Sequence, residues 1–512
     1  MTGRSSIILV LTLACVEPTG TIPLAADRLL EEPTVMVLGE AFPAMEATPS
    51  PTLPEPLRTR YADPAGVPGG IGTEEAPFED LQVALRALEP GDRLVVKKGV
   101  FRGHFAVDDL CQRGEEDAPI QVIAEPGATL TPGDDQDVPV LRLNRSHWMI
   151  QGLDIDAESR VDRAVHVAGI ASNSPASHVI LAGLRATGAR RVGIAFGPDL
   201  RSSKLINAQI DNNGDGDNAA DGLRIYGNVD GLELAGLRVH DNSADGLHLP
   251  NHRDPPAGFE DRPLGAPTDL SIHSSRFHDN GDDGLELRDG REVEVQALRV
   301  WNHLQRENSA CIKIQGAVTD AQLENNHLAE CTRALWIGQG VHDAVAEALV
   351  PNDVLVMRNY MVSQLATRTS GLVLTTVKDV RVYHNIISQY DSGLTIHGDE
   401  FENRDIQVRN NLFHEHEVRS FNFTVWENVD RFDYNAFARG SGAAEGRVGN
   451  EQSSVLDWIN GGRLADSILA EAVSFMALDL GNVSGINLVD RGVPIAGIPI
   501  VGSAPDIGIA EK

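Results

Sequence analysis

A five-residue pattern of apolar and polar positions recurs through the middle of the chain. In this pattern, called the frame here, a small residue stands second, aliphatic residues stand third and fifth, and the fourth residue varies. Such alternation predicts a short strand with one buried face and one free face. The frames occupy residues 221–225, 245–249, 283–287, 310–314, 333–337, 370–374 and 392–396.

Successive frames are 22 to 24 residues apart where no loop is inserted, as between Gly222 and Gly246. A strand and turn of this length cannot bury its apolar face alone, but stacked copies can. The sequence therefore predicts an all-β fold, a single-stranded right-handed parallel β-helix. Strands stacked in register lie about 4.8 Å apart, so equivalent frame positions form columns on the outer surface. The first-place column then reads Asp221, Asp245, Asp283, Ala310, Arg333, and the fourth-place column reads Arg224, His248, Glu286, Lys313, Trp336.

Asparagines accompany the frames. Asn242 and Asn280 each stand four residues before a frame glycine. In later coils, similar aliphatic runs are followed by Asn302, Asn326, Asn359, Asn385 and Asn411. Because asparagine tolerates left-handed backbone and can bond its own turn, we expect one stacked asparagine at each bend.

The chain before the repeats predicts a leader and a spacer. Arg4 and the apolar run at residues 7–14 predict a signal peptide over residues 1–15, and hence a secreted or cell-surface protein. Cys15 after Leu13 and Ala14 resembles a lipoprotein cleavage site, so a lipid anchor stays open. Residues 16–60 are rich in Pro, Thr, Glu and Ala and predict a disordered linker. Residues 61–512 then form one β-helix domain, and no later run reaches the roughly 18 apolar residues of a membrane span.

The two ends of the solenoid are expected to be closed. Phe78, Leu81, Leu85 and Leu88 share a helical face. They predict a helix over residues 78–88, with Pro77 in its first turn, that caps the open N-terminal end of the stack. Residues 487–492 and 504–508 are expected to close the other end. Both ends resemble those of secreted right-handed parallel β-helix proteins.

The charge of the chain limits its binding partners, and its cysteines limit the possible metal sites and disulfides. The formal net charge of −31 argues against nucleic acid and anionic membranes. An acidic polysaccharide would also be repelled unless a divalent cation reverses the sign locally. Cys111, Cys311 and Cys331 have no metal-like spacing. Cys311 and Cys331 fall near adjacent coils, so a disulfide between them stays open. We expect a monomer.

Four acidic residues, Asp245, Asp282, Asp283 and Glu286, fall on consecutive coils beside Lys313 in this register. Ca²⁺ takes about six to eight oxygen ligands, largely from carboxylates and carbonyls. Carboxylates that converge without a cation repel and raise one another's pKa. The sequence therefore predicts a calcium site. The alternatives are ordinary Asp-Gly turn chemistry and a surface lysine that pairs with Glu286 across strands.

These residues resemble the pectate lyases of polysaccharide lyase family 9. The matching segments are Ala-Asp-Gly at 244–246, Asp-Asp-Gly-Leu-Glu at 282–286 and Ile-Lys-Ile-Gln-Gly at 312–316. The resemblance implies that the four acidic residues bind Ca²⁺ and that Lys313 abstracts a proton in β-elimination on a uronic-acid polysaccharide such as pectate. We expect substrate contacts from Arg333, Trp336, His248 and Arg288. The chain departs from the family at Glu286, where Asp is usual, at Cys311, where Gly is common, and in an extra loop at residues 250–268.

Three other functions stay open. A glycoside hydrolase on this fold uses two carboxylates and no metal, although the Gly-His-Gly and Arg-Ile-Lys segments of polygalacturonases are missing. A non-catalytic carbohydrate-binding or surface solenoid fits the lipoprotein-like start and the long spacer. A uronan epimerase shares the proton abstraction but returns the proton to the opposite face. The fold alone does not choose between them, and a lyase is the favoured prediction.

Overall fold

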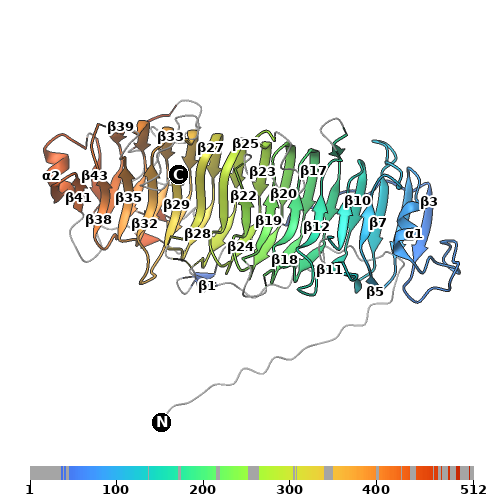
Figure 1. Ribbon diagram of the computed structural model, residues 1–512. Coiled ribbons are helices and arrows are strands. Elements are labelled where there is room, and N and C mark those ends of the chain that lie inside the picture. Colours follow the sequence, from blue (N-terminus) through green and yellow to red (C-terminus); the bar gives the residue numbers. More distant parts are fainter. Residues whose placement is uncertain are drawn as a thin grey trace, which may run out of the picture.

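The computed structural model shows one elongated stack of strands with coils following one another along its length (Figure 1). It describes residues 47–470 except for internal gaps, and a few short stretches on either side. The gaps are residues 136–137, 171–173, 215–218, 252–263, 304–305, 307, 339–349, 399–402, 428, 439–444 and 465. The predicted leader, most of the predicted linker and most of the two predicted closing segments lie outside the described residues.

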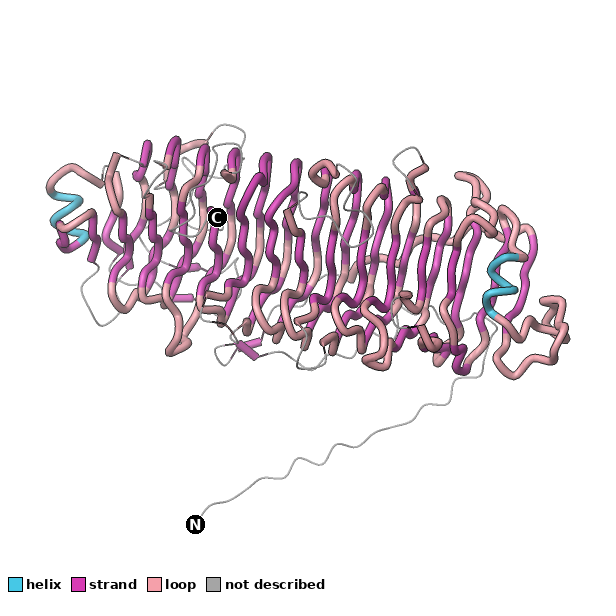
Figure 2. The backbone as a smooth tube through the Cα atoms, in the orientation of Figure 1, coloured by secondary structure: helices cyan, strands magenta, loops and turns pink. Residues whose placement is uncertain are grey.

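Three parallel sheets run the length of the stack, and nearly all of their strands are short (Figure 2). Sheet I contains β6 (Phe105–Val107), β9 (Leu141–Leu143), β12 (Arg163–Val167), β16 (Val192–Phe196), β19 (Asp221–Ile225), β22 (Leu247–Leu249), β25 (Leu285–Gln296), β27 (Ala310–Glu324), β29 (Arg333–Gly338), β32 (Ser370–Thr375), β35 (Ser392–His397), β38 (Arg419–Phe423) and β41 (Glu445–Val448), with β42 (Glu451–Ser454) added antiparallel. The long strands β25 and β27 continue into sheet II, so these two sheets are joined there.

Sheet II contains β3 (Arg58–Ala62), β4 (Asp92–Val96), β7 (Ile120–Ala124), β10 (Trp148–Gln151), β13 (Ala176–Ser177), β14 (Ile180–Ala182), β17 (Leu200–Ile206), β20 (Val229–Ala235), β23 (Thr268–His273), β30 (Asn352–Met357), β33 (Lys378–Tyr383), β36 (Arg404–Arg409) and β39 (Val429–Asp433). β3 begins at Arg58, inside the segment predicted to be a disordered linker, because it pairs in parallel with β4. The boundary at residue 60 was therefore placed too late.

Sheet III contains β5 (Gly99–Arg102), β8 (Ala128–Thr131), β11 (Asp154–Asp156), β15 (Arg185–Thr187), β18 (Gln209–Asp211), β21 (Arg238–His240), β24 (Arg276–His278), β26 (Arg299–Trp301), β28 (His327–Ala329), β31 (Tyr360–Val362), β34 (Ile386–Ser388), β37 (Leu412–His414), β40 (Ala436–Ala438) and β43 (Ile468–Ala470). Two small antiparallel pairs lie outside the three sheets: β1 (Met36–Val37) with β2 (Glu40–Ala41), and β44 (Ser474–Phe475) with β45 (Val483–Ser484). The predicted parallel β-helix is confirmed.

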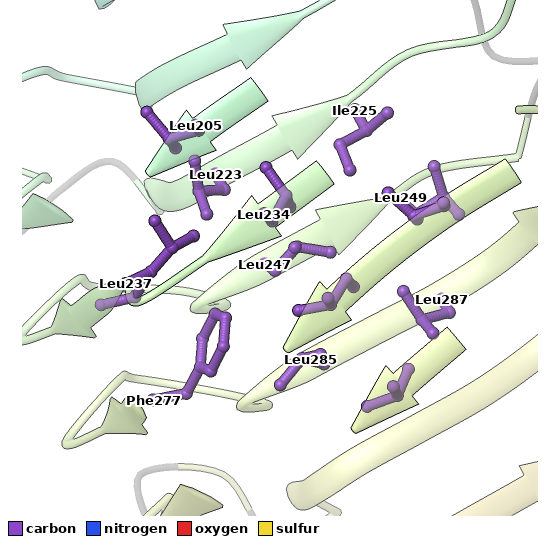
Figure 3. Packing of buried hydrophobic residues seen from close by; sticks show 14 of the residues in the cluster. Leu205, Leu223, Ile225, Leu234, Leu237, Leu247, Leu249, Phe277, Leu285 and Leu287 are labelled. Carbon is purple, nitrogen blue, oxygen red and sulfur yellow. The ribbon is translucent and has the colours of Figure 1, made fainter. Parts of the chain in front are cut away.

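The core is a file of aliphatic side chains inside the coils. The third and fifth frame residues, such as Leu223 and Ile225, are fully buried and lie above their counterparts in the next coil (Figure 3). Leu234 of sheet II and Phe277 of sheet III fill the same interior (Figure 3). Burial of one such side chain contributes about 2 kcal/mol to folding, so the period-two alternation determines which face of each strand turns inward.

The register follows the frames as predicted. His248 pairs with Arg224 on one side and with Glu286 on the other. Glu286 in turn pairs with Lys313, and Lys313 with Trp336. The fourth-place column is therefore continuous over five coils of sheet I.

The asparagines form two ladders, whereas one column was expected. Asn213, Asn242 and Asn280 are joined by side-chain hydrogen bonds of 2.8–2.9 Å at the bend from sheet III to sheet I. A second ladder at the bend from sheet II to sheet III joins Asn326, Asn359, Asn385, Asn411 and Asn435. The left-handed residue is the one before each ladder asparagine, as with Asp241 and Asn325. Asn302 was assigned to the wrong position: it is itself left-handed, and His303 follows it.

The helix near the N-terminal end, α1, spans Leu81–Arg86 and is shorter than predicted. It starts late because the Asp80 carboxylate accepts the backbone N–H groups of Gln82 and Val83, while Phe78 forms an isolated bridge with Ala62. The Gln82 amide exchanges two hydrogen bonds, 2.7 and 2.8 Å, with the backbone of Ala106 in β6, the first strand of sheet I. Its role as a cap stays a prediction. At the other end α2 spans Val455–Asn460.

A disulfide joins Cys311 to Cys331, with the Cα atoms 5.6 Å apart. The sequence had left this pairing open. The bond ties Cys311, in β27, to Cys331, in the short turn between β28 and β29. Within the described residues, no helix is both long enough and apolar enough to span a membrane.

Candidate functional site

Each first-place aspartate serves the backbone of the next coil. Asp245 Oδ1 accepts the N–H of Asp283 at 3.0 Å, and Asp283 Oδ1 accepts the N–H of Ala310 at 2.6 Å. Asp221 Oδ1 accepts the N–H of Asp245 in the same way at 3.3 Å. The structural explanation of Asp-Gly is thus correct for one oxygen of each carboxylate. The other oxygen, Oδ2, faces the side chains of His248 or Lys313.

Lys313 lies against two of these acidic groups. Its Nζ is 2.8 Å from Glu286 Oε1 and 3.2 Å from Asp283 Oδ2. The cross-strand pair with Glu286 proposed as the ordinary alternative is therefore present, but the contact with Asp283 makes it part of a larger group. The Asp283 and Glu286 side chains are 1% and 4% exposed, and Lys313 is 14% exposed. Lys313 is thus the most exposed of the three side chains, and the two carboxylates beneath it are buried.

His248 has acidic residues beside both of its ring nitrogens. Its Nδ1 is 3.2 Å from Asp221 Oδ2 and 3.8 Å from Asp245 Oδ2, and its Nε2 is 3.4 Å from Glu286 Oε2. Arg224 also donates to Asp221 Oδ2 at 2.7 Å. Asp221 was not among the residues predicted for the site, so sequence reasoning missed its place beside His248. The available signal was their frame positions: Asp221 stands first in its frame and His248 stands fourth in the next frame.

Asp282 differs from the prediction. Its Oδ2 accepts from Arg306 at 2.5 Å, and it is not among the carboxylates whose oxygens converge. It stands ahead of the first frame position, so the pleat does not fix its direction, and a guanidinium from the following loop pairs with it. Of the four predicted ligands, the structure brings together Asp245, Asp283 and Glu286, whose ligand atoms lie within 4.8 Å of one another.

The predicted substrate contacts flank this cluster. Arg288 donates to Glu286 Oε1 at 2.9 Å, with 46% of its side chain exposed. Trp336 lies one coil beyond Lys313, with the amine 5.3 Å from the ring centroid. Arg333 packs over the same ring at 4.9 Å. His248 lies on the other side of Glu286, as described above. All four therefore fall on the outer face around the same column.

The electrostatics follow from burial and like charge. Burial, together with Asp221, Asp283 and Glu286, raises the pKa of Asp245 well above its usual value. Burial raises the pKa of Asp283 to about 7, against the opposing effect of Lys313. For Glu286 burial also acts upward, but Lys313, Arg288 and His248 outweigh it and lower the pKa. Burial would lower the pKa of Lys313, but Asp283 and Glu286 outweigh it and raise the pKa. Without a metal ion the amine is held protonated.

The raised pKa of Asp283 predicts how the stability of the calcium-free protein depends on pH. An unfolded aspartate titrates near pH 3.9, so between about pH 4 and 7 the folded state binds more protons at this group than the unfolded state. The contribution of Asp283 to unfolding free energy therefore falls as pH rises through this window. We expect urea midpoints measured in EDTA at pH 5 and 7.5 to differ more for the wild type than for Asp283→Asn. Equal pH slopes for the two proteins would contradict the assignment.

The three converging carboxylates suit a hard cation. They are buried and supply oxygen ligands only, which Ca²⁺ prefers. Burial and, after it, mutual repulsion raise the pKa of Asp245 and Asp283, and a bound divalent ion would offset both effects. Asp245, Asp283 and Glu286 are therefore the residues that would hold it.

No family model matches the chain, and no curated protein does. The parallel sheets decide the fold. The chain is a parallel β-helix protein.

Among solved structures it is similar to pectate lyase Pel9A at 17% identity, with 89% of this chain and 97% of that chain covered and a TM-score of 0.45. An alginate lyase from Paenibacillus sp. str. FPU-7 gives 16% identity, coverage of 67% and 94%, and a TM-score of 0.40. The A-module of the mannuronan C-5 epimerase AlgE6 from Azotobacter vinelandii gives 10% identity, coverage of 80% and 98%, and a TM-score of 0.48. At these identities the activity has to be argued from the side chains of this β-helix protein.

Proposed function

We propose that this protein is a polysaccharide lyase that cleaves a uronic-acid-containing polysaccharide, such as pectate, by calcium-dependent β-elimination. One observation carries the proposal: the Lys313 amine contacts two of the three buried carboxylates that suit a cation, on the outer face of sheet I. A candidate base and a candidate metal site thus share one surface.

The reaction needs a base beside an acidified C–H group. The C5 proton of a uronic acid is weakly acidic, and Lys313 Nζ would accept it while the bond to the leaving oxygen at C4 breaks. Asp245, Asp283 and Glu286 would hold the calcium ion, whose positive charge would stabilise the developing negative charge and lower the pKa of the amine. In the calcium-free protein Asp283 and Glu286 keep Lys313 protonated and unable to act as a base.

The proposed location follows from the substrate. Uronic-acid polysaccharides are extracellular polymers, and residues 1–15 were predicted to export the chain. Export with or without a lipid on Cys15, and a monomeric state, are part of the proposal. A chain with a net charge of −31 repels a polyanion, and a bound cation would offset this repulsion at the site.

The test is a panel of pectate, alginate and glucuronan, each assayed with Ca²⁺ and with EDTA. We expect unsaturated products, detected by their ultraviolet absorbance, on at least one polymer and only with Ca²⁺. Reducing ends without unsaturation would establish a hydrolase instead. Inversion at C5 without cleavage would establish an epimerase, and binding without any chemistry would establish a carbohydrate-binding solenoid.

A further inference from the structure

The bend from sheet III to sheet I repeats one contact from coil to coil. A residue with left-handed backbone is followed by the residue that fills the bend, as Asp241 is followed by Asn242. The second frame residue of the coil before is glycine, because a Cβ atom at Gly222 would lie 2.8 Å from Asn242 Nδ2. A Cβ atom at Gly246 would lie equally close to Asn280 Nδ2. Neighbouring coils therefore meet here through a glycine and an amide side chain.

This series changes as it reaches the coil of Lys313. The residue that fills the bend after Asn280 is His303, whose imidazole ring bonds a backbone carbonyl instead of an amide of the first ladder. The residue that fills the next bend is Cys331, which follows the left-handed Glu330. The amide ladder has therefore ended before the coil that carries the candidate base.

The Cys311–Cys331 disulfide takes the place of the missing contact. Cys311 is the second residue of its frame and so corresponds to Gly246, while Cys331 fills the bend of the following coil as Asn280 does. Both cysteines are fully buried. A covalent bond thus stands where the preceding coils use a close non-covalent contact, and it does not open with the thermal fluctuations that break hydrogen bonds.

The disulfide lies next to the groups of the candidate site. In β27, Cys311 directly follows Ala310, whose N–H donates to Asp283 Oδ1 at 2.6 Å, and it belongs to the same frame as Lys313. Its partner directly precedes β29, in which the Trp336 ring lies 5.3 Å from the lysine amine. The bond therefore joins the strand that carries the amine to the strand that packs beside it.

We propose that the Cys311–Cys331 disulfide is a positioning element of the site, which fixes the start of β27 and thereby holds the Lys313 amine against Asp283 and Glu286. That the amine is a base rests on the proposed function, whereas the hold on the amine rests on the contacts above. Displacement of a reacting group by about 1 Å can lower a rate about 100-fold, so a looser strand lowers the rate while the fold is retained.

Two double variants test the proposal. Cys311→Ala with Cys331→Ala, the alanine pair, removes the bond and the contact. Cys311→Gly with Cys331→Asn, the glycine–asparagine pair, replaces the bond by the pair of residues that Gly246 and Asn280 form in an earlier coil. Rescue by the second pair distinguishes a contact that positions the strand from a general need for cysteine.

The first readout needs no activity. In the calcium-free proteins, mass spectrometry measures hydrogen exchange of residues 310–314 and acetylation of Lys313 by acetic anhydride, with residues 392–396 and Lys204 as references. We expect the alanine pair to raise the exchange and acetylation rates at least about threefold, with the references unchanged, and the glycine–asparagine pair to give intermediate rates.

The second readout is the initial rate of unsaturated-product formation, at a temperature where thermal melts show all three proteins folded. We expect kcat to fall about 10-fold in the alanine pair, with KM and calcium affinity changed less than about threefold, and to recover in part in the glycine–asparagine pair. An alanine pair with a lower melting temperature but wild-type kcat, exchange and acetylation would show that the disulfide only stabilises the fold, and the proposal would be overturned.

The outcomes separate this proposal from the lyase proposal. If the wild type forms no unsaturated product, the lyase proposal is overturned, and faster exchange and acetylation in the alanine pair still support the hold on Lys313. If the wild type is a lyase and the alanine pair exchanges faster without loss of kcat, the positioning role is overturned and the lyase stands. If the alanine pair does not fold, the glycine–asparagine pair decides, and wild-type values in all its readouts overturn the proposal.

Discussion

Lys313→Ala is expected to lower the rate of unsaturated-product formation by about 10²- to 10⁴-fold, the usual contribution of a general base. The same change is expected to strengthen calcium binding, because the ammonium group that lies 2.8 Å from Glu286 and 3.2 Å from Asp283 competes with a metal ion for them. Lower activity with tighter calcium binding is a combination that general loss of structure does not produce. Initial rates and calcium titration calorimetry on the same preparation measure both.

Lys204→Ala is the matched control for that variant. Lys204 also pairs with a cross-strand glutamate, Glu233, at 2.6 Å, but it does so on sheet II. Its replacement is expected to change the rate less than twofold. Full activity in Lys313→Ala on a polymer that the wild type degrades would leave Lys313 as an ordinary surface lysine.

Asp283→Asn and Asp282→Asn are expected to separate widely in calcium affinity. Asp283 is buried among the converging carboxylates, so loss of its charge is expected to weaken calcium binding at least about tenfold. The asparagine oxygen can still accept the N–H of Ala310, so the fold is retained. Asp282 faces Arg306, and its replacement is expected to leave calcium affinity within about twofold.

Thermal melts with and without Ca²⁺ provide the second readout, because a ligand that binds only the folded state raises the melting temperature. The shift seen for the wild type should persist in Asp282→Asn and shrink in Asp283→Asn. Equal losses in both variants would restore the four-ligand site expected from the sequence, and a wild type without any calcium shift would remove the calcium site altogether.

The frames could be predicted because burial leaves little freedom. Leu223, Leu247 and Leu285 must point inward, and the strand period of two then places Arg224, His248 and Glu286 outward in one column. The same reasoning placed Lys313 beside Glu286 before any contact was known. Register within a sheet is thus the part of the site that sequence reasoning determines well.

Residues outside the pleat could not be placed in this way. Asp282 lies in the turn before its strand, and its direction depends on Arg306, which arrives from a loop one coil later. The ladders were merged because both bends use the same local signal, a left-handed residue followed by asparagine, and that signal does not say which bend it marks. The predicted helix was too long because the apolar periodicity includes Phe78, whereas the Asp80 cap starts the helix at Leu81.

The second asparagine ladder restricts where this molecule can accept new sequence. In the coils from β27 onward, each connection from sheet II to sheet III is two residues long, and its second residue is a ladder asparagine. The connections from sheet I to sheet II include residues 250–267 and 339–351, so length varies there without breaking either ladder. Grafted loops, fused domains and natural insertions are therefore expected to be tolerated better along this edge than at the bend from sheet II to sheet III. That edge borders the surface with the carboxylates and Lys313. Changes in loop length or sequence there would alter which ligands reach the site and leave the stacked strands unchanged.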